Sequence, residues 1–102
     1  MRVISIRTLR EFWRGHPDSE GPLKDWFDAT ETAQWRSFLD VRQTFGSADT
    51  AKVRSGNTAT IFDIAGNKYR LIAAIHYNTA TVYAMMVLTH KEYGKGRWKA
   101  QL

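Results

Sequence analysis

Three stretches in the second half of the chain constrain the fold most, because they have the composition of β-strands. Residues 58–64, 68–77 and 81–89 are rich in β-branched and aromatic side chains, which strands favour. Gly66-Asn67 separates the first pair of stretches and Asn78-Thr79 the second, and such dipeptides form the tight turns of hairpins. The three stretches therefore predict an antiparallel β-meander.

The first half of the chain has helical spacing instead. Residues 3–6 predict a short strand. Thr8, with Glu11 three positions later, has the pattern of a capping box at the start of a helix, and Gly15-His16-Pro17 ends that helix. The apolar residues of this helix fall at i, i+3 and i+4, which is one helix face: Leu9, Phe12 and Trp13.

A second helix is predicted after Asp18 or Ser19, either of which is a suitable N-cap. It repeats the same spacing with Leu23, Trp26 and Phe27. Residues 30–49 predict a short helix followed by a loop. The expected order is β-α-α-β-β-β, an α+β domain spanning residues 1–102 in which two to three helices pack on the meander.

Alternation along the middle strand separates an apolar face from a more open one. The face expected to meet the helices carries Tyr69, Leu71, Ala73, Ile75 and Tyr77. The opposite face carries Lys68, Arg70, Ile72, Ala74 and His76.

The register of the two predicted hairpins determines which residues lie opposite Arg70 and His90. A two-residue loop at Gly66-Asn67 places Asp63 opposite Arg70, so one simple role for Arg70 is a cross-strand ion pair. In the next hairpin, a three-residue loop places His90 opposite Lys68, whereas a two-residue loop places Thr89 there. The sequence leaves these two registers open.

Charge is divided unevenly along the 102 residues. The first 51 residues carry seven Lys/Arg and eight Asp/Glu, and the remaining residues carry eight and two, within a net charge of +5. Such a basic half indicates a polyanionic partner, most often nucleic acid, or simply a solvated basic surface. The chain has no cysteine and no apolar run long enough to span a bilayer, so we expect a cytoplasmic protein without a membrane segment.

The sequence THKEYGKGRW, residues 89–98, concentrates titratable and cationic groups after the last strand. We expect it to lie beside Lys68 and Arg70, with Lys52 and Arg54 reaching the same end of the sheet. Such a patch could cut RNA through the RNA's own 2′-OH, which requires a base, an acid and cations around the phosphate. Histidine suits the proton transfers because its ordinary pKa is about 6.5.

Each of these residues also has an ordinary structural explanation. His90 is explained equally by a surface position, and Tyr93 and Trp98 by capping the core at the sheet edge. Glu92 is expected to pair with a nearby lysine. The three histidines, at positions 16, 76 and 90, lack the short spacing of metal ligands, so we expect no metal and no cofactor, and we place His16 and His76 outside the site.

Two segments together resemble the HigB family, toxins of type II toxin–antitoxin systems within the RelE-like superfamily. These segments are GNKYRLI, residues 66–72, and THKEY, residues 89–93, supported by the His16-Pro17 helix end and by Trp35. The resemblance covers nearly the whole chain and implies a RelE-like fold. One departure is Gly94, where the family usually has an acidic residue.

The resemblance implies an mRNA endonuclease that acts on the ribosome, and a HigA-like helix-turn-helix antitoxin as partner. By position it implies that Arg70 grips the scissile phosphate, that His90 and Tyr93 transfer protons, and that Lys68 and Lys95 stabilise charge. The basic residues predicted to bind RNA around them are Lys52, Arg54, Lys91, Lys95 and Arg97. The alternative is a basic RNA- or ribosome-binding module that uses the same patch without catalysis.

Overall fold

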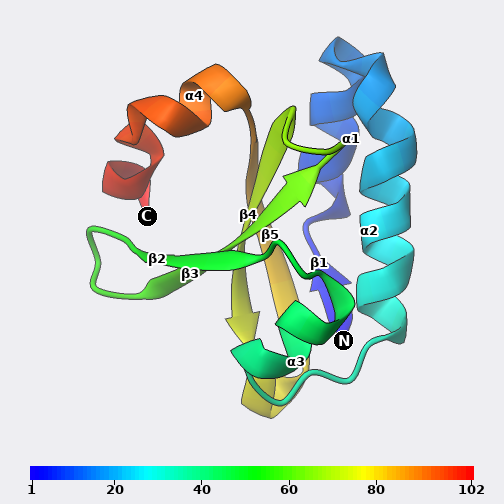
Figure 1. The fold of residues 1–102 in the computed structure, drawn as a ribbon, viewed down its shortest axis with the longest axis vertical. Helices are drawn as coiled ribbons and strands as arrows, with labels where there is room; N and C mark the ends of the chain where they lie inside the picture. The colour runs from blue at the N-terminus through cyan, green and yellow to red at the C-terminus, as the bar shows by residue number, and fades with distance from the viewer.

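The computed structural model describes residues 1–102 and places five strands in one sheet, in the order β1-β5-β4-β3-β2 (Figure 1). Neighbours pair antiparallel except β1 and β5, which run parallel, so the sheet is mixed. The strands are β1 (Arg2–Ile4), β2 (Asp49–Lys52), β3 (Thr58–Ile64), β4 (Tyr69–His76) and β5 (Thr81–Thr89).

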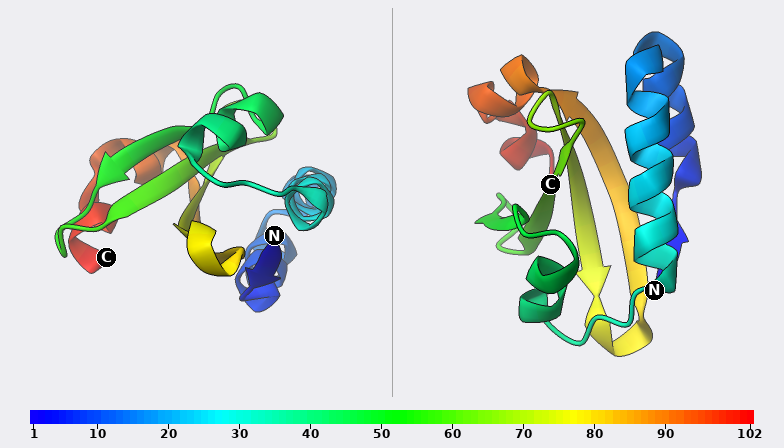
Figure 2. Two further views of the ribbon diagram at one scale, coloured as in Figure 1. Left: turned by 90° about the horizontal axis from the view of Figure 1, so that it is seen from below. Right: turned by 45° about the vertical axis from the view of Figure 1, so that its right-hand side comes forward.

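Helices lie on both sides of this sheet. Three precede β2, namely α1 (Ile6–Gly15), α2 (Glu20–Thr32) and α3 (Phe38–Thr44), and a short α4 (His90–Lys95) follows β5. α1 and α2 cover one face, whereas α4 and the C-terminal 3-10 helix (Arg97–Gln101) lie on the other (Figure 2). None of these helices combines the length and apolar character that a membrane crossing requires.

Each face of the sheet has its own hydrophobic cluster, as alternation along β4 predicts. Tyr69, Leu71 and Ala73 join the larger cluster, where they pack with buried residues of α1 and α2. Ile72, on the other face, packs with Trp98 of the C-terminal helix. The face of Arg70 is therefore less open than expected, because the end of the chain covers its centre.

The predicted α+β class, the N-terminal strand and the antiparallel meander are confirmed. Two elements were missed: β2 forms within and just beyond the predicted loop, and α4 forms from the first residues after β5. β2 has a mixed sequence, and it becomes a strand because β3 offers it a free edge, with Lys52 opposite Thr58.

The predicted capping box at Thr8 is wrong. α1 begins at Ile6, with Ser5 at its N-cap in a left-handed conformation (φ 74°). Thr8 is therefore already inside the first turn, where its N–H donates to the Ser5 carbonyl at 2.9 Å. Glu11 accepts from Arg7 Nε at 2.9 Å instead of returning to Thr8.

Candidate functional site

Arg70 lies directly opposite Asp63 in the β3–β4 ladder. Its Nε lies 3.0 Å from Asp63 Oδ1 in an ion pair, and the two side chains are only 12% and 27% exposed. The tight turn after β3, closed by the Lys68 N–H on the Ala65 carbonyl at 3.3 Å, sets this register. The expected cross-strand ion pair is confirmed.

Three further contacts fix the plane of the Arg70 guanidinium. Its Nη1 donates to the Asn67 carbonyl at 2.7 Å and to the Tyr69 carbonyl at 3.3 Å. The Tyr93 ring lies against it, with 5.1 Å between the guanidinium carbon and the ring centroid. Nη2 is left without a protein acceptor, so two of the five N–H donors of arginine remain for a ligand.

Tyr93 is itself held by the C-terminal segment. Its ring stacks on Trp98 at 5.6 Å with an interplanar angle of 17°, and Trp98 Nε1 donates to the Tyr93 carbonyl at 3.2 Å. Trp98 is only 3% exposed, which confirms that it caps a hydrophobic core. Arg70, Tyr93 and Trp98 therefore form one continuous stack.

His90 is exposed at the first position of α4. Its backbone N–H donates to the Lys68 carbonyl at 3.1 Å, which places His90 opposite Lys68. The ladder reaches this register through an irregularity between Ile72 and Ala73, where Met86 pairs with the former and Ala84 with the latter. Met85 is thus the extra residue of a β-bulge.

Thr89 and Glu92 form a capping box that starts α4. The Glu92 N–H donates to Thr89 Oγ1 at 3.2 Å, and the Thr89 N–H donates to Glu92 Oε1 at 2.9 Å. The backbone N–H of Thr89 is the main cause that holds the pKa of Glu92 below its ordinary value. The expectation that Glu92 pairs with a lysine is wrong, because its carboxylate caps the helix.

The Lys68 side chain turns to Asp18, in the 3-10 helix Pro17–Ser19 between α1 and α2. The other oxygen of the same carboxylate accepts from the Tyr69 hydroxyl at 2.7 Å. Hydrogen bonds from Lys68 and then Tyr69 lower the pKa of Asp18, and the Asp18 carboxylate raises the pKa of Lys68. Lys68 is therefore a cation that is already paired with a carboxylate at the protein surface.

His16 lies on the same side as Asp18, as part of an aromatic group. Its ring stacks on Phe12 at 4.1 Å and meets the edge of Tyr69 at 5.5 Å. Sequence reasoning gave Asp18 only the role of a helix cap and set His16 aside. No local pattern signals their contact with β4, because about fifty residues separate Asp18 from Lys68 and Tyr69.

The backbone of Lys52 lies far from the Arg70 end of the sheet, so the expectation that Lys52 reaches that end is wrong. Lys52 pairs with Thr58 at the start of β3, five residues before Asp63, which is roughly 17 Å along an extended strand. Arg54 lies beside the C-terminus instead, where its N–H donates to the Lys99 carbonyl at 2.9 Å.

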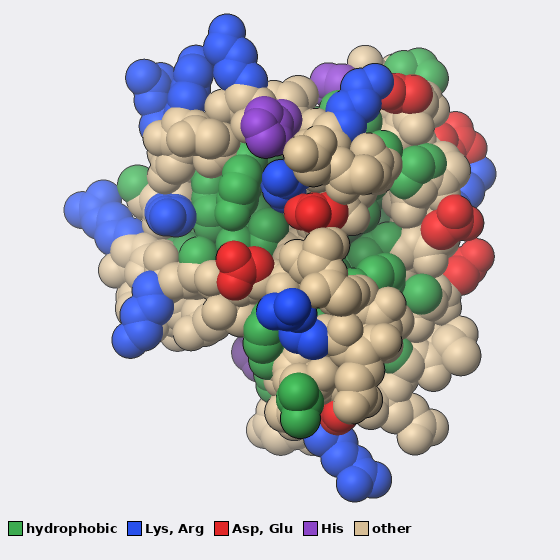
Figure 3. Space-filling model, in the orientation of Figure 1, with side chains coloured by type: hydrophobic (Ala, Val, Ile, Leu, Met, Phe, Trp, Pro, Cys, Tyr) green, Lys and Arg blue, Asp and Glu red, His purple; other side chains and the backbone are tan.

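The remaining cations of the basic half are exposed and make no ion pair: Lys52, Arg54, Lys91, Lys95, Arg97 and Lys99. Lysine and arginine side chains project around a recessed hydrophobic area between α4, the C-terminal helix and the β2–β3 loop (Figure 3). Such an arrangement suits an extended anion more than a single small one.

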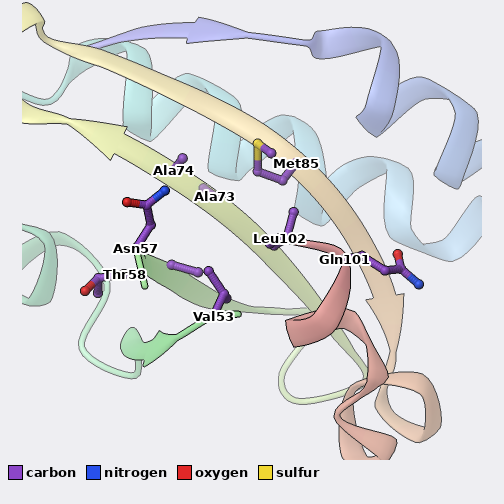
Figure 4. Close-up of a pocket in the computed structure, with 9 residues that line it drawn as sticks. Val53, Asn57, Thr58, Ala73, Ala74, Met85, Gln101 and Leu102 are labelled. Atoms are coloured by element: carbon purple, nitrogen blue, oxygen red, sulfur yellow. The ribbon is translucent and has the colours of Figure 1, made fainter. Parts of the chain in front are cut away.

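An apolar pocket of about 190 Å³ lies farther along the same face of the sheet. Val53, Asn57 and Thr58 approach it from the β2–β3 side, Ala74 and Met85 from β4 and β5, and Leu102 from the C-terminus (Figure 4). Its nine lining residues include no titratable side chain and no candidate site residue. Elsewhere in the chain, no three His, Asp or Glu residues cluster in a way that could hold a metal ion.

Gly94 occupies an ordinary helical position inside α4. A Cβ built there meets nothing within 4 Å, and its φ is not in the left-handed region, unlike that of Gly96, which ends the helix at φ 72°. The fold therefore accepts a side chain at position 94, and turn geometry does not explain the glycine.

Two comparisons find similar proteins. Residues 19–96 match the model of a family described as HigB toxin, the RelE-like toxic component of a toxin–antitoxin system. One relative is a protein of Escherichia coli O6:H1 named mRNA interferase HigB. It is 25% identical over 95 residues, which cover 93% of this chain and 90% of the relative.

Proposed function

The chain belongs to the HigB family of RelE-like toxic components of toxin–antitoxin systems, and from this premise we propose that it is an endoribonuclease that cuts messenger RNA during translation. The relative from Escherichia coli is named an mRNA interferase, which supports the reaction class. The proposal also makes the cytoplasmic ribosome its place of action and a helix-turn-helix antitoxin its partner.

The observation that carries the proposal is the state of Arg70. Its guanidinium is fixed on three sides by Asp63, the Asn67 carbonyl and the Tyr93 ring, and it offers the two N–H groups of Nη2 to a ligand. A planar, charged fork suits a phosphate oxygen. Arg70 is thus the candidate for binding the scissile phosphate and its developing charge.

The proposed reaction uses the RNA's own 2′-OH as nucleophile. Its oxygen attacks the adjacent phosphorus, the bond to the 5′ oxygen breaks, and one proton leaves the 2′-OH while another reaches the 5′ oxygen. His90 is the leading candidate for a proton transfer because its imidazole is exposed beside Lys68. Tyr93 is the second candidate, and Lys95 adds positive charge from the end of α4.

Lys68 contributes differently from the role that the resemblance implies. Its ammonium is bound by Asp18 on the helix side of the sheet. Lys68 therefore has to leave the Asp18 carboxylate before it can bind an RNA phosphate. We therefore assign it a supporting role in RNA binding.

Mapping message ends tests the proposal. Purified protein is incubated with translating ribosomes, and the 5′ ends of the message are compared with those from an Arg70→Ala, His90→Ala double variant. The matched control is Arg10→Ala, His76→Ala, because Arg10 is an exposed cation on α1 and His76 lies at the other end of β4. We expect new ends with the wild type and the control only.

The unpaired cations also support a second candidate, a module that binds RNA or the ribosome without cutting. It predicts binding that weakens steeply with salt, and the same messages left intact by wild type and double variant alike. New 5′ ends from the wild type alone would reject it.

A further inference from the structure

Asp63 is the one acidic side chain in contact with the proposed phosphate-binding arginine. The pair is withdrawn from water, since the two side chains are 12% and 27% exposed. An exposed ion pair contributes little to stability. The Asp63–Arg70 pair is partly buried, and it also restrains the direction in which the Arg70 side chain points. The question is whether this carboxylate competes with RNA or prepares the site for it.

Counting the donors of Arg70 answers that question. Nε forms the ion pair with Asp63 Oδ1, and Nη1 donates to the carbonyls of Asn67 and Tyr69. Asp63 therefore lies against the Nε side of the guanidinium, and no protein acceptor binds Nη2. A competitor would instead cover the donors that the phosphate needs.

Fixing this side chain in advance has an energetic consequence. A free arginine loses rotamer entropy when it is immobilised. In this fold the loss occurs on folding, through Asp63, the carbonyls and the Tyr93 ring, so a bound phosphate does not have to order the side chain again.

We propose that Asp63 is a positioning residue that aims the free Nη2 edge of Arg70 at the scissile phosphate. This inference rests on the proposed function. It assigns Asp63 no contact with the RNA and no proton transfer. Its effect is exerted through the orientation of Arg70.

Three substitutions at position 63 separate position from charge. Asp63→Asn keeps an oxygen acceptor at the same place and removes the charge. Asp63→Glu keeps the charge and moves it by one methylene. Asp63→Ala removes both. Asp49→Ala is the matched control, because Asp49 is an exposed aspartate on the neighbouring strand β2 that pairs with no cation.

The assay measures message cleavage on translating ribosomes. It gives two quantities, the single-turnover rate and the protein concentration at half-saturation. Thermal unfolding first checks that each variant is folded. We expect Asp63→Ala and Asp63→Glu to lower the rate about 100-fold, as misplacement of a catalytic group does, with a smaller change in half-saturation. Asp63→Asn should retain most of the rate, and Asp49→Ala all of it. Asp63→Ala added to Arg70→Ala should cost nothing further.

Each other result has a definite meaning. If Asp63→Ala cuts faster or binds the message more tightly than wild type, Asp63 competes with RNA for Arg70. If Asp63→Glu is fully active and Asp63→Asn is weak, the charge of Asp63 matters and its position does not. Either result overturns the inference. If Asp63→Ala does not fold, the comparison of Asn with Glu still decides. A wild type that cuts while all three variants match it refutes only the role of Asp63, whereas a wild type that cuts nothing refutes the proposed function and this role together.

Discussion

Thr89→Ala is the most informative single change for the link between fold and site. It removes the hydroxyl oxygen that accepts the Glu92 N–H at 3.2 Å. α4 has only six residues, and a helix this short is not stable on its own. The position of His90 and Tyr93, both on α4, therefore depends on the cap and on the stack against Trp98.

The expected cost follows from the kind of interaction removed. Loss of a threonine N-cap costs about 1 kcal/mol, within a range of roughly 0.5–2. For a domain near this size, each 1 kcal/mol shifts the midpoint of thermal unfolding by about 4 °C or somewhat more. Thr89→Ser keeps the hydroxyl and is the control, for which we expect almost no shift.

Two assays together locate the effect. Thermal or urea unfolding reports the global free energy of unfolding, and message cleavage on ribosomes reports the geometry of the site. If α4 unravels while the rest stays folded, cleavage falls and the midpoint of unfolding hardly moves. If α4 unfolds only together with the rest, the midpoint falls and cleavage hardly changes, because nearly all molecules remain folded. Unchanged cleavage together with unchanged stability in Thr89→Ala would refute the argument that the cap holds the site.

Glu92→Gln adds a pH dependence with a defined sign. The pKa of Glu92 is lowered in the folded protein from an ordinary value of 4.5. Its charge therefore stabilises the fold fully above that value, and the contribution disappears as the pH falls through the lower folded pKa. Urea midpoints should show wild type more stable than Glu92→Gln at neutral pH, with the two converging as the pH falls below the folded pKa of Glu92. A difference that grows on acidification would contradict this.

Three further changes test the core, the helix and the Lys68 contact. Leu71→Ala removes a fully buried side chain of the larger cluster and should cost about 2–5 kcal/mol in urea unfolding, a large part of a typical 5–15 kcal/mol. Gly94→Ala fills open space in a helix and should raise the free energy of unfolding by up to about 1 kcal/mol; a lower midpoint would contradict the helical geometry. Asp18→Asn releases Lys68, so RNA binding should become tighter and its salt dependence steeper by about one phosphate contact, and an unchanged slope would mean that Lys68 never reaches the RNA.

The same four-residue pattern occurs twice in the chain with opposite outcomes. Thr8 and Glu11 match the capping-box sequence as well as Thr89 and Glu92 do, but only the second pair forms the box. Thr89 ends a strand in an extended conformation (φ −70°, ψ 162°), which is the geometry of an N-cap. Thr8 follows a helix start that lies earlier, at Ser5. The pattern therefore predicts a cap only where the preceding element is also known.

Strand pairing shows the same limit. The faces of β4 follow from alternation alone, and they were predicted. The pairing of β2 with β3 and of β1 with β5 depends on edges that exist only after the meander has formed. The register of His90 depends on the bulge at Met85, and no residue type near it marks the extra position.

Sequence distance explains why one cation of the site was placed correctly and the other was not. Asp63 and Arg70 belong to one hairpin, and a turn of two residues fixes their pairing. Asp18 and Lys68 are separated by fifty residues and meet only because α1 and α2 pack against β4. A turn determines its register locally, whereas a contact between layers requires the packed core. The partner of Arg70 was therefore accessible to sequence reasoning and that of Lys68 was not.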